Sequence, residues 1–266
     1  MTVNAIHGEL VRLFSTRLPL WTLLAAVACG GGLTGLLALI GPENSSTPMP
    51  GIDTVQGAGL VVGLGALLLF VPALIGTIAI TGEYRHRTIG TTFLAVPRRG
   101  RVLFAKLAVY TLLGLLYGVV ASVSSGLALL GAAAVRGVDI GLTGEQLVVT
   151  LAQLAVASAV YMVLGVAIGA LARHQLLAIG IVMGYFYFLE HVLMLIPGVN
   201  AVYAFLPGGA TSSLTRFTFL TDTIAEQTSL GAAPLTSPAV GAAILIAYAL
   251  VAAAVAVVAP LRRDLR

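Results

Sequence analysis

Long apolar runs alternate with short polar segments along the whole chain, and six of these runs reach the length of a membrane span. A helix needs about 20 apolar residues to cross the hydrocarbon core of a bilayer. The six predicted spans lie near residues 18–41, 57–81, 102–135, 147–172, 175–197 and 236–261. Because a helix satisfies its own backbone hydrogen bonds in lipid, the pattern predicts an all-α polytopic membrane protein with a six-helix transmembrane domain at residues 18–261.

The first apolar run has a second interpretation, as a secretory signal peptide. Arg12 and Arg17 precede it, and the run contains Ala26-Val27-Ala28-Cys29, which resembles a lipoprotein cleavage site poorly. The apolar residues continue well past Cys29 to Ile40, which is too long for the core of a signal peptide. We therefore interpret this run as a membrane helix.

Residues 1–17 precede the first span and show a short helical pattern. Apolar residues recur at helical spacing, while the polar residues fall elsewhere on the wheel: Val3, Ile6, Leu10 and Leu13 against Glu9, Arg12 and Ser15. This pattern predicts an amphipathic helix that lies in the membrane interface. A frayed cytoplasmic tail is the alternative.

The stretch 198–235 is neither a clean span nor a hydrophilic loop. Proline and glycine at 197–198 and 207–209 interrupt it, so we expect short re-entrant or interfacial helices on the outer side, with their backbone groups covered by protein. Within the second span, Pro72 is expected to kink the helix. The chain ends in a short basic tail at 262–266.

The charges are few and lie on alternate sides of the spans. Apolar residues make up 59% of the chain and charged residues 9%, too few charges to cover a soluble domain of this length. Twelve of the fourteen Lys and Arg residues fall in the N-terminal segment, the 82–106 stretch, the 173–174 turn and the tail. The positive-inside rule then places both termini in the cytoplasm, and it explains the basic character better than nucleic-acid binding does.

The segment 82–101, between the second and third spans, carries the densest charge. It leads out of the membrane as Glu83-Tyr84-Arg85-His86-Arg87-Thr88, continues with apolar positions at helical spacing that include Phe93, and is stopped by Pro97. A plain interpretation is a solvated loop whose arginines set the topology and bind anionic headgroups. That interpretation explains less well why Glu83 stands at the boundary and why a short apolar-faced helix lies between two basic clusters.

Several kinds of chemistry have no support in the sequence. There is no Gly-x-x-x-x-Gly-Lys-Ser/Thr motif, and the single lysine, Lys106, follows Phe-Ala, so we expect no nucleotide bound by this chain. The four histidines have no metal-ligand spacing, and the single Cys29 forms no intrachain disulfide. Ser122, Ser124 and Ser125 are interpreted as small packing residues. We expect no metal and no cofactor on this chain.

Glu190 and His191 form an ionisable pair near the far end of the fifth span. Glu190 stands sixteen residues beyond His174, about 24 Å along a helix, and so is expected in the outer leaflet. Such a pair is costly in a membrane unless it faces protein or water. Two roles remain open: an interhelical lock to a Tyr, a Ser or Gln153, or a contact on a substrate path with Phe186 and Tyr187, whose rings instead could face lipid.

These motifs together resemble one family. The run from Gly82 to Leu107, with its acidic-aromatic-basic start, Arg87-Thr88-Ile89, a short helix, proline and a final lysine, resembles the first cytoplasmic loop of ABC-2 type permeases. Glu9-Leu10-Val11-Arg12 resembles the connecting helix that precedes their first span. The run from Glu190 to Pro197, followed by Leu206-Pro207-Gly208-Gly209, is similar to small actinobacterial members. The loop departs modestly from the family, which usually shows Gly-Thr after the basic residue.

The resemblance implies a fold, partners and residue roles. The helix within 83–96 would be a coupling helix that docks into a cytoplasmic ABC ATPase subunit through the residues Glu83, Tyr84, Arg85, His86, Arg87, Thr88 and Phe93. Within it, Arg85 and Arg87 would pair with acidic residues of the ATPase, and Glu83 would hold the segment to the N-terminal interfacial helix. ATP and Mg would be bound by that ATPase, present in two copies, beside a second permease subunit that is identical or paralogous. The implied function is ATP-driven export of a hydrophobic or amphipathic compound, such as a drug, an antibiotic peptide or a lipid, across a bacterial plasma membrane.

Two other classes of function stay open. A polytopic membrane enzyme would use Glu190 and His191, but it would need more polar residues at one membrane depth than the sequence shows. A membrane scaffold or assembly factor would have no transport path. A reading frame for an ATPase next to this one would favour the transporter.

Overall fold

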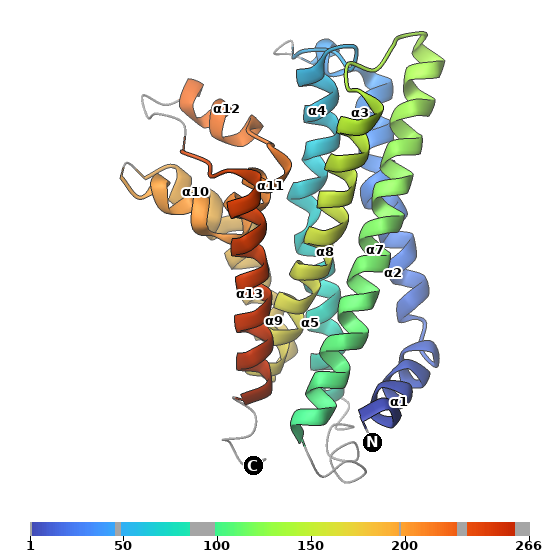
Figure 1. Cartoon of the computed structure of the whole chain (residues 1–266), viewed down its shortest axis with the longest axis vertical. Coiled ribbons are helices and arrows are strands. Elements are labelled where there is room, and N and C mark those ends of the chain that lie inside the picture. Colours follow the sequence, from blue (N-terminus) through green and yellow to red (C-terminus); the bar gives the residue numbers. More distant parts are fainter. Residues whose placement is uncertain (1, 46–48, 86–98, 197, 228–232, 259–266) are drawn as a thin grey trace.

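The computed structural model describes all residues except 1, 46–48, 86–98, 197, 228–232 and 259–266. The described part of the chain is a bundle of helices and contains no strand (Figure 1). Six helical segments in it are long and apolar enough to cross a membrane. The predicted class, an all-α polytopic membrane protein with six spans, is confirmed.

The spans lie close to their predicted positions, although several are built from more than one helix. The first joins α2 (Leu18–Val27), a π-helical turn (Ala28–Gly32) and α3 (Leu33–Ile40). The second joins α4 (Val55–Gly63), a 3-10 segment (Leu64–Leu68) and α5 (Phe70–Arg85). The third and fourth are the single helices α7 (Arg99–Arg136) and α8 (Gly144–Ala172). The fifth joins α9 (Gln175–Val182), a π-helical stretch (Met183–Leu189) and α10 (Glu190–Met194), and the sixth is α13 (Pro238–Val258).

The helices that flank the 82–101 segment are longer than expected. α5 continues to Arg85 and α7 begins at Arg99. Residues 86–98, which hold most of the predicted coupling helix, lie outside the described residues. Glu83, Tyr84 and Arg85 therefore belong to the last turn of a helix. The irregular part of the second span precedes Pro72, which stands in the first turn of α5, where a missing backbone N–H costs no hydrogen bond.

Helix α8 is the centre of the bundle. In its most apolar window 83% of the residues are buried, against 17% for the first and sixth spans. It packs closely on α5, where a Cβ added to Gly165 would come within 1.9 Å of the Ala73 carbonyl oxygen. It packs equally closely on α7, where a Cβ at Gly118 would come within 2.4 Å of the Ala155 carbonyl oxygen. Small residues permit these approaches in lipid, where hydrophobicity does not drive helix association.

Buried hydroxyls link the same helices. Thr77 of α5 donates to the Gly165 carbonyl of α8 at 2.9 Å, and Ser122 of α7 donates to the Leu151 carbonyl of α8 at 2.7 Å. Ser125 of α7 is hydrogen-bonded to Thr34 of α3 at 2.7 Å. Ser122 and Ser125 of the third span thus join α7 to neighbouring helices, whereas Ser124 donates to the Ala121 carbonyl of its own helix.

The segment after the fifth span folds into short helices. They are a 3-10 turn (Asn200–Phe205), α11 (Pro207–Thr215) and α12 (Phe219–Gln227). α11 packs on α8 and α13 and buries four hydroxyl residues, Thr211, Ser212, Ser213 and Thr215. Three of these hydroxyls donate to carbonyls one turn earlier in the same helix, so little polar surface is left unpaired.

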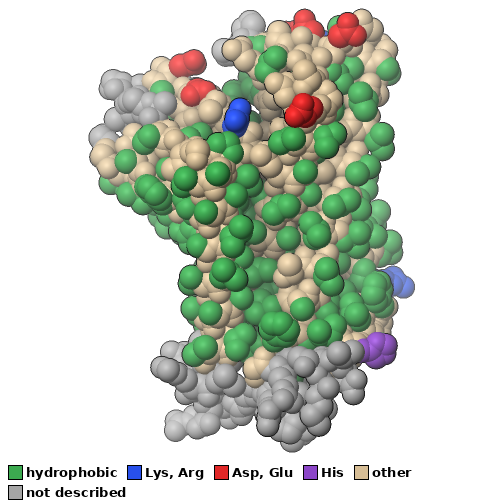
Figure 2. Space-filling model, in the orientation of Figure 1, with side chains coloured by type: hydrophobic (Ala, Val, Ile, Leu, Met, Phe, Trp, Pro, Cys, Tyr) green, Lys and Arg blue, Asp and Glu red, His purple; other side chains and the backbone are tan. Residues whose placement is uncertain are grey.

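The two ends of the bundle differ. α1 (Thr2–Phe14) and the last turn of α13 lie at one end, here called the α1 end, and α12 lies toward the other (Figure 1). On the face shown in Figure 2, hydrophobic side chains are spread over the surface between the ends, and acidic side chains appear near the end opposite α1. There Arg136 is paired with Glu43 and also donates to the Ala38 carbonyl at 2.8 Å.

Candidate functional site

Four charged side chains meet at the α1 end, where α1, α5 and α7 come together. They are Glu9 and Arg12 of α1, Glu83 of α5 and Lys106 of α7, and we call them the ion cluster. Helical spacing places Glu9 and Arg12 on one face of α1, three residues apart. Glu83 lies in the last turn of α5 and Lys106 in the second turn of α7, so the cluster ties together the ends of both helices that border residues 86–98.

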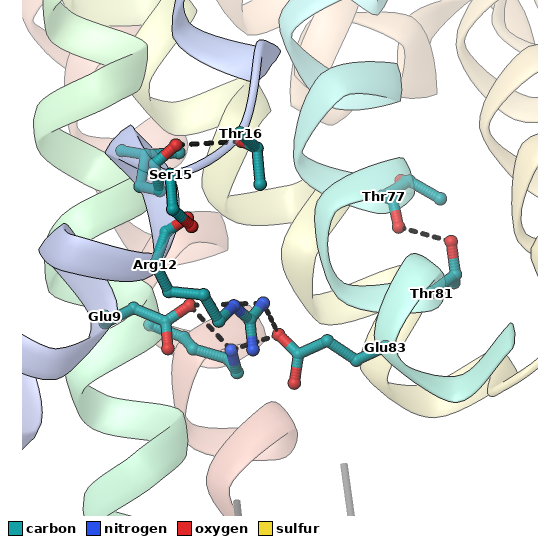
Figure 3. Close-up of polar contacts among 9 residues, drawn as sticks. Glu9, Arg12, Ser15, Thr16, Thr77, Thr81 and Glu83 are labelled. Carbon is teal, nitrogen blue, oxygen red and sulfur yellow. Dashed lines mark hydrogen bonds and ion pairs between the residues drawn. The ribbon is translucent and has the colours of Figure 1, made fainter. Parts of the chain in front are cut away.

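The cluster is arranged around the Glu83 carboxylate (Figure 3). Its Oε1 accepts hydrogen bonds from Arg12 Nη2 and from Lys106 Nζ. Lys106 Nζ also donates to Glu9 Oε1 at 2.7 Å, and Arg12 Nη2 lies 3.5 Å from the same oxygen. Two positive and two negative groups therefore share one site, and their formal charges cancel.

Burial makes this arrangement energetically sensitive. The Lys106 side chain is 1% exposed, Glu83 4% and Glu9 7%, whereas Arg12 is 34% exposed. Removing one member of a buried ionic group leaves an uncompensated charge, which typically costs about 3–5 kcal/mol. Burial alone would lower the pKa of Arg12, but the hydrogen bond and charge of Glu83, with the charge of Glu9, raise it, so Arg12 stays cationic.

The orientation of α1 follows from this cluster and from its apolar contacts. Leu13 is buried in the same hydrophobic cluster as Leu103 and Tyr110 of α7, and Ile6 and Leu10 pack against that cluster. Val11 and Phe14 are exposed instead, 57% and 72% respectively. The polar face with Glu9 and Arg12 therefore turns toward the bundle, a feature that the amphipathic pattern of residues 1–17 did not reveal.

The residues predicted to dock an ATPase divide into two groups. Glu83 is buried in the ion cluster, Tyr84 packs half-buried against the core, and Arg85 is exposed and donates to Gln175 at the start of α9 at 3.3 Å. His86, Arg87, Thr88 and Phe93 lie outside the described residues. Glu83 thus binds other parts of its own chain, including α1.

Glu190 occupies a second buried site, in the half of the bundle away from α1. It is 1% exposed, and its Oε2 accepts a hydrogen bond of 2.7 Å from the Gly208 amide in the first turn of α11. The backbone amides at a helix N-terminus favour a negative group. Glu190 therefore links the fifth span to α11 through a backbone amide.

The residues around Glu190 enclose a small cavity. It has a volume of about 30 Å³ and is lined by aromatic rings and hydroxyls, among them Tyr161, Phe186, Tyr203 and Thr211. Glu190 Oε1 and His191 Nδ1 are buried and have no hydrogen-bond partner among the described residues. A cavity of this size has room for about one or two water molecules.

The predicted aromatic residues face different directions. Phe186 is buried, with its ring centroid 5.0 Å from that of Tyr161. Tyr187 is 61% exposed and packs its ring edge against Phe70, with the centroids 5.7 Å apart. Phe186 thus belongs to the interior beside Glu190, whereas Tyr187 lies on the outer surface of the bundle.

The fold and the ion cluster define a class of protein: a polytopic membrane protein in which an N-terminal helix is joined by ion pairs to the second and third spans. Within the described residues, no group of three or more His, Cys, Asp or Glu side chains is placed to hold a metal ion. A family model described as "ABC-2 family transporter protein" matches residues 16–189, well over half of the chain. The chain belongs to this family. A search of the curated proteins gave no match.

Proposed function

We propose that this chain is the permease subunit of an ATP-driven exporter, and that a separate ABC ATPase subunit works through the 82–101 segment. The family membership carries this proposal, because ABC-2 permeases are membrane subunits of transporters. The ion cluster supports it, since it fixes both helix ends that border residues 86–98 to each other and to α1. A force on that segment would therefore be transmitted to α1, α5 and α7 together.

The proposed mechanism is alternating access. Two ATPase subunits bind ATP and Mg, close on each other, and tilt the docked helices of two permease subunits, identical or paralogous, as rigid bodies. The substrate, a hydrophobic or amphipathic compound such as a drug, an antibiotic peptide or a lipid, passes outward between the permeases. In this orientation the α1 end is cytoplasmic, and the membrane is a bacterial plasma membrane.

The buried polar residues support a permease better than a membrane enzyme. Glu190 is engaged by the Gly208 amide, and the adjoining cavity of about 30 Å³ is too small for an organic substrate. We therefore assign Glu190 the role of an interhelical lock that holds α11 to the fifth span. His191 lies beside the same cavity.

Co-purification tests the proposal. The chain is expressed with the ATPase encoded beside it and is purified through a tag on the chain alone. The ATPase is expected to co-purify, and the variant Arg85→Glu with Arg87→Glu is expected to release it. Arg136→Glu, a charge reversal at the opposite end of the bundle, serves as the control. Purification of the chain without the ATPase, or equal recovery with both variants, would contradict the proposal.

A further inference from the structure

A basic groove opens at the α1 end, away from the ion cluster. It has a volume of about 510 Å³ and lies between the end of α5 and the start of α9. Tyr84 and Arg85 line one side, and Arg173, His174, Gln175 and Leu176 line the other. Among the described residues that line it, none is acidic. The nearest acidic neighbour in sequence, Glu83, is already bound by Arg12 and Lys106.

Arg173 occupies an unusual backbone position. It is the residue that ends α8, with φ at 53°, and its amide donates to the Gly169 carbonyl at 3.1 Å. A helix that ends in this left-handed conformation usually has glycine there, because a Cβ is disfavoured. The chain thus keeps a long cationic side chain at a position where the backbone alone would favour glycine, and the side chain faces the groove.

The lining is suited to a phosphate group. Arginine guanidinium groups bind phosphate oxygens through paired hydrogen bonds, and two arginines and His174 line the groove together. The groove also lies at the first turn of α9, which has no side-chain cap on its amides. The amides and dipole of a helix N-terminus add attraction for an anion.

The apolar part of the same surface indicates where the anion comes from. Leu176 is 76% exposed and Leu177 is 56% exposed, directly beside the cationic groups and at the beginning of a membrane span. An apolar surface would contribute nothing to the binding of a free phosphate ion. A phospholipid would place its phosphate between the arginines and its acyl chains along α9.

We propose that this groove is a binding site for the headgroup of an anionic phospholipid. The site joins the end of the second span to the turn between the fourth and fifth spans. A bound lipid therefore bridges helices that have no ion pair with each other among the described residues. The proposal does not rest on the transport function, but Arg85 belongs both to this groove and to the proposed ATPase contact. The test therefore uses Arg173, which has no part in that contact.

Lipid binding to the purified full-length chain tests the proposal. Phosphatidylglycerol and phosphatidylcholine are added separately to the chain in a neutral detergent, and bound lipid is counted by native mass spectrometry while Tm is followed. Phosphatidylglycerol is expected to bind with at least tenfold higher affinity and to raise Tm. Equal binding of the two lipids would overturn the proposal.

Two matched variants distinguish lipid binding at the groove from a general effect of positive charge on the chain. Arg173→Gly removes the groove cation and suits the left-handed backbone, so the chain is expected to fold while its affinity for phosphatidylglycerol falls about tenfold. Arg216 ends α11 with φ at 55°, away from the groove, so Arg216→Gly removes the same charge and relieves the same backbone conformation. Arg216→Gly is expected to keep wild-type lipid binding. An equal loss in both variants would overturn the proposal.

Two further measurements distinguish a phospholipid from a free anion or a protein as the ligand of the groove. Inorganic phosphate alone is expected to leave Tm unchanged at concentrations where phosphatidylglycerol raises it; an equal rise would show a site for a free anion. The Arg173→Gly chain is also expected to keep its association with the co-expressed ATPase. If it loses the ATPase and keeps the lipid, the groove is a protein-docking site and the lipid proposal is wrong.

Discussion

Lys106 is the single lysine of the chain, and its side chain is among the most completely buried in the structure, at 1% exposure. Its ammonium group lies between Glu9 and Glu83. Lys106→Met removes this charge and leaves two carboxylates facing Arg12 alone. We expect a loss of about 3–5 kcal/mol in the free energy of unfolding, measured by denaturant titration of the purified chain.

The control for this prediction is Lys106→Arg, which keeps the charge and is expected to lose less. The double variant Lys106→Met with Glu83→Gln removes one charge of each sign and leaves Glu9 and Arg12 as a pair. Its loss in the free energy of unfolding is expected to be smaller than the sum of the losses of the two single variants, because the four groups act together. Additive losses would show that the cluster is not a unit.

The hydrogen bond between Glu190 and Gly208 can be tested by adding one atom, the Cβ of an alanine at position 208. A Cβ on Gly208 would come within 2.1 Å of Glu190 Oε2. Gly208→Ala must therefore displace the carboxylate and break its hydrogen bond, at an expected cost of about 1–3 kcal/mol in the free energy of unfolding. In a Glu190→Ala background the same change should cost much less, because no carboxylate is left to displace.

Gly180→Ala supplies the matched control, since a Cβ at Gly180 meets no atom within 4 Å. Equal losses from Gly208→Ala in the two backgrounds would contradict the assigned contact. The sequence predicted that Glu190 faces either protein or water, because a charge in lipid is costly. It did not identify the partner, since a backbone amide leaves no signature in the residue types.

At the scale of elements, the contact between α5 and α8 depends on backbone proximity. Gly165→Ala would place a Cβ 1.9 Å from the Ala73 carbonyl oxygen, which is backbone and can move only with its helix. We expect the helices to separate locally, with a loss of about 1–3 kcal/mol in the free energy of unfolding. Gly131→Ala, where a Cβ meets no atom within 4 Å, should cost nothing measurable. The prediction fails if both variants unfold alike.

The helices themselves were largely predictable from the sequence. Apolar run length located all six spans, because the lipid core demands a minimum length of helix. α8 begins at Gly144, three residues before the predicted start, and the capping box of Thr143 and Gln146 marks this start in the sequence. The π-helical turns at Ala28–Gly32 and Met183–Leu189 were not predicted, since packing against neighbouring helices rather than sequence periodicity decides this winding.

The ion cluster shows where prediction from local patterns stops. Glu9 and Arg12 were read as the polar side of an interfacial helix, and Lys106 as part of a basic loop. In the structure these residues meet at Glu83. Glu9 and Lys106 are 97 residues apart in the chain, and Arg12 and Glu83 are 71 residues apart. Contacts of that range follow from how the spans pack. The family resemblance implied a link from Glu83 to the N-terminal helix, and Glu83 is paired there with Arg12. It did not indicate that Lys106 joins them.

At the scale of the whole molecule, the charge distribution predicts one orientation in the membrane. Arg12, Arg85 and Arg173 belong to elements at the α1 end, whereas Arg136 lies with Glu43 at the other. We expect the α1 end to be cytoplasmic. A cysteine introduced at exposed Ser15, in a Cys29→Ala background, should resist a membrane-impermeant thiol reagent in intact cells, whereas one at exposed Asn44 should react. The reverse pattern would contradict the orientation.

The central claim is that a separate ATPase drives this chain through the 82–101 segment. The most direct measurement is the rate of ATP hydrolysis by the ATPase subunit in lipid nanodiscs, with and without this chain. We expect the chain to change that rate several-fold, and the Arg85→Glu with Arg87→Glu variant to return it to the rate of the ATPase alone. An ATPase that hydrolyses ATP at one rate whether the chain is present, absent or altered would contradict the account.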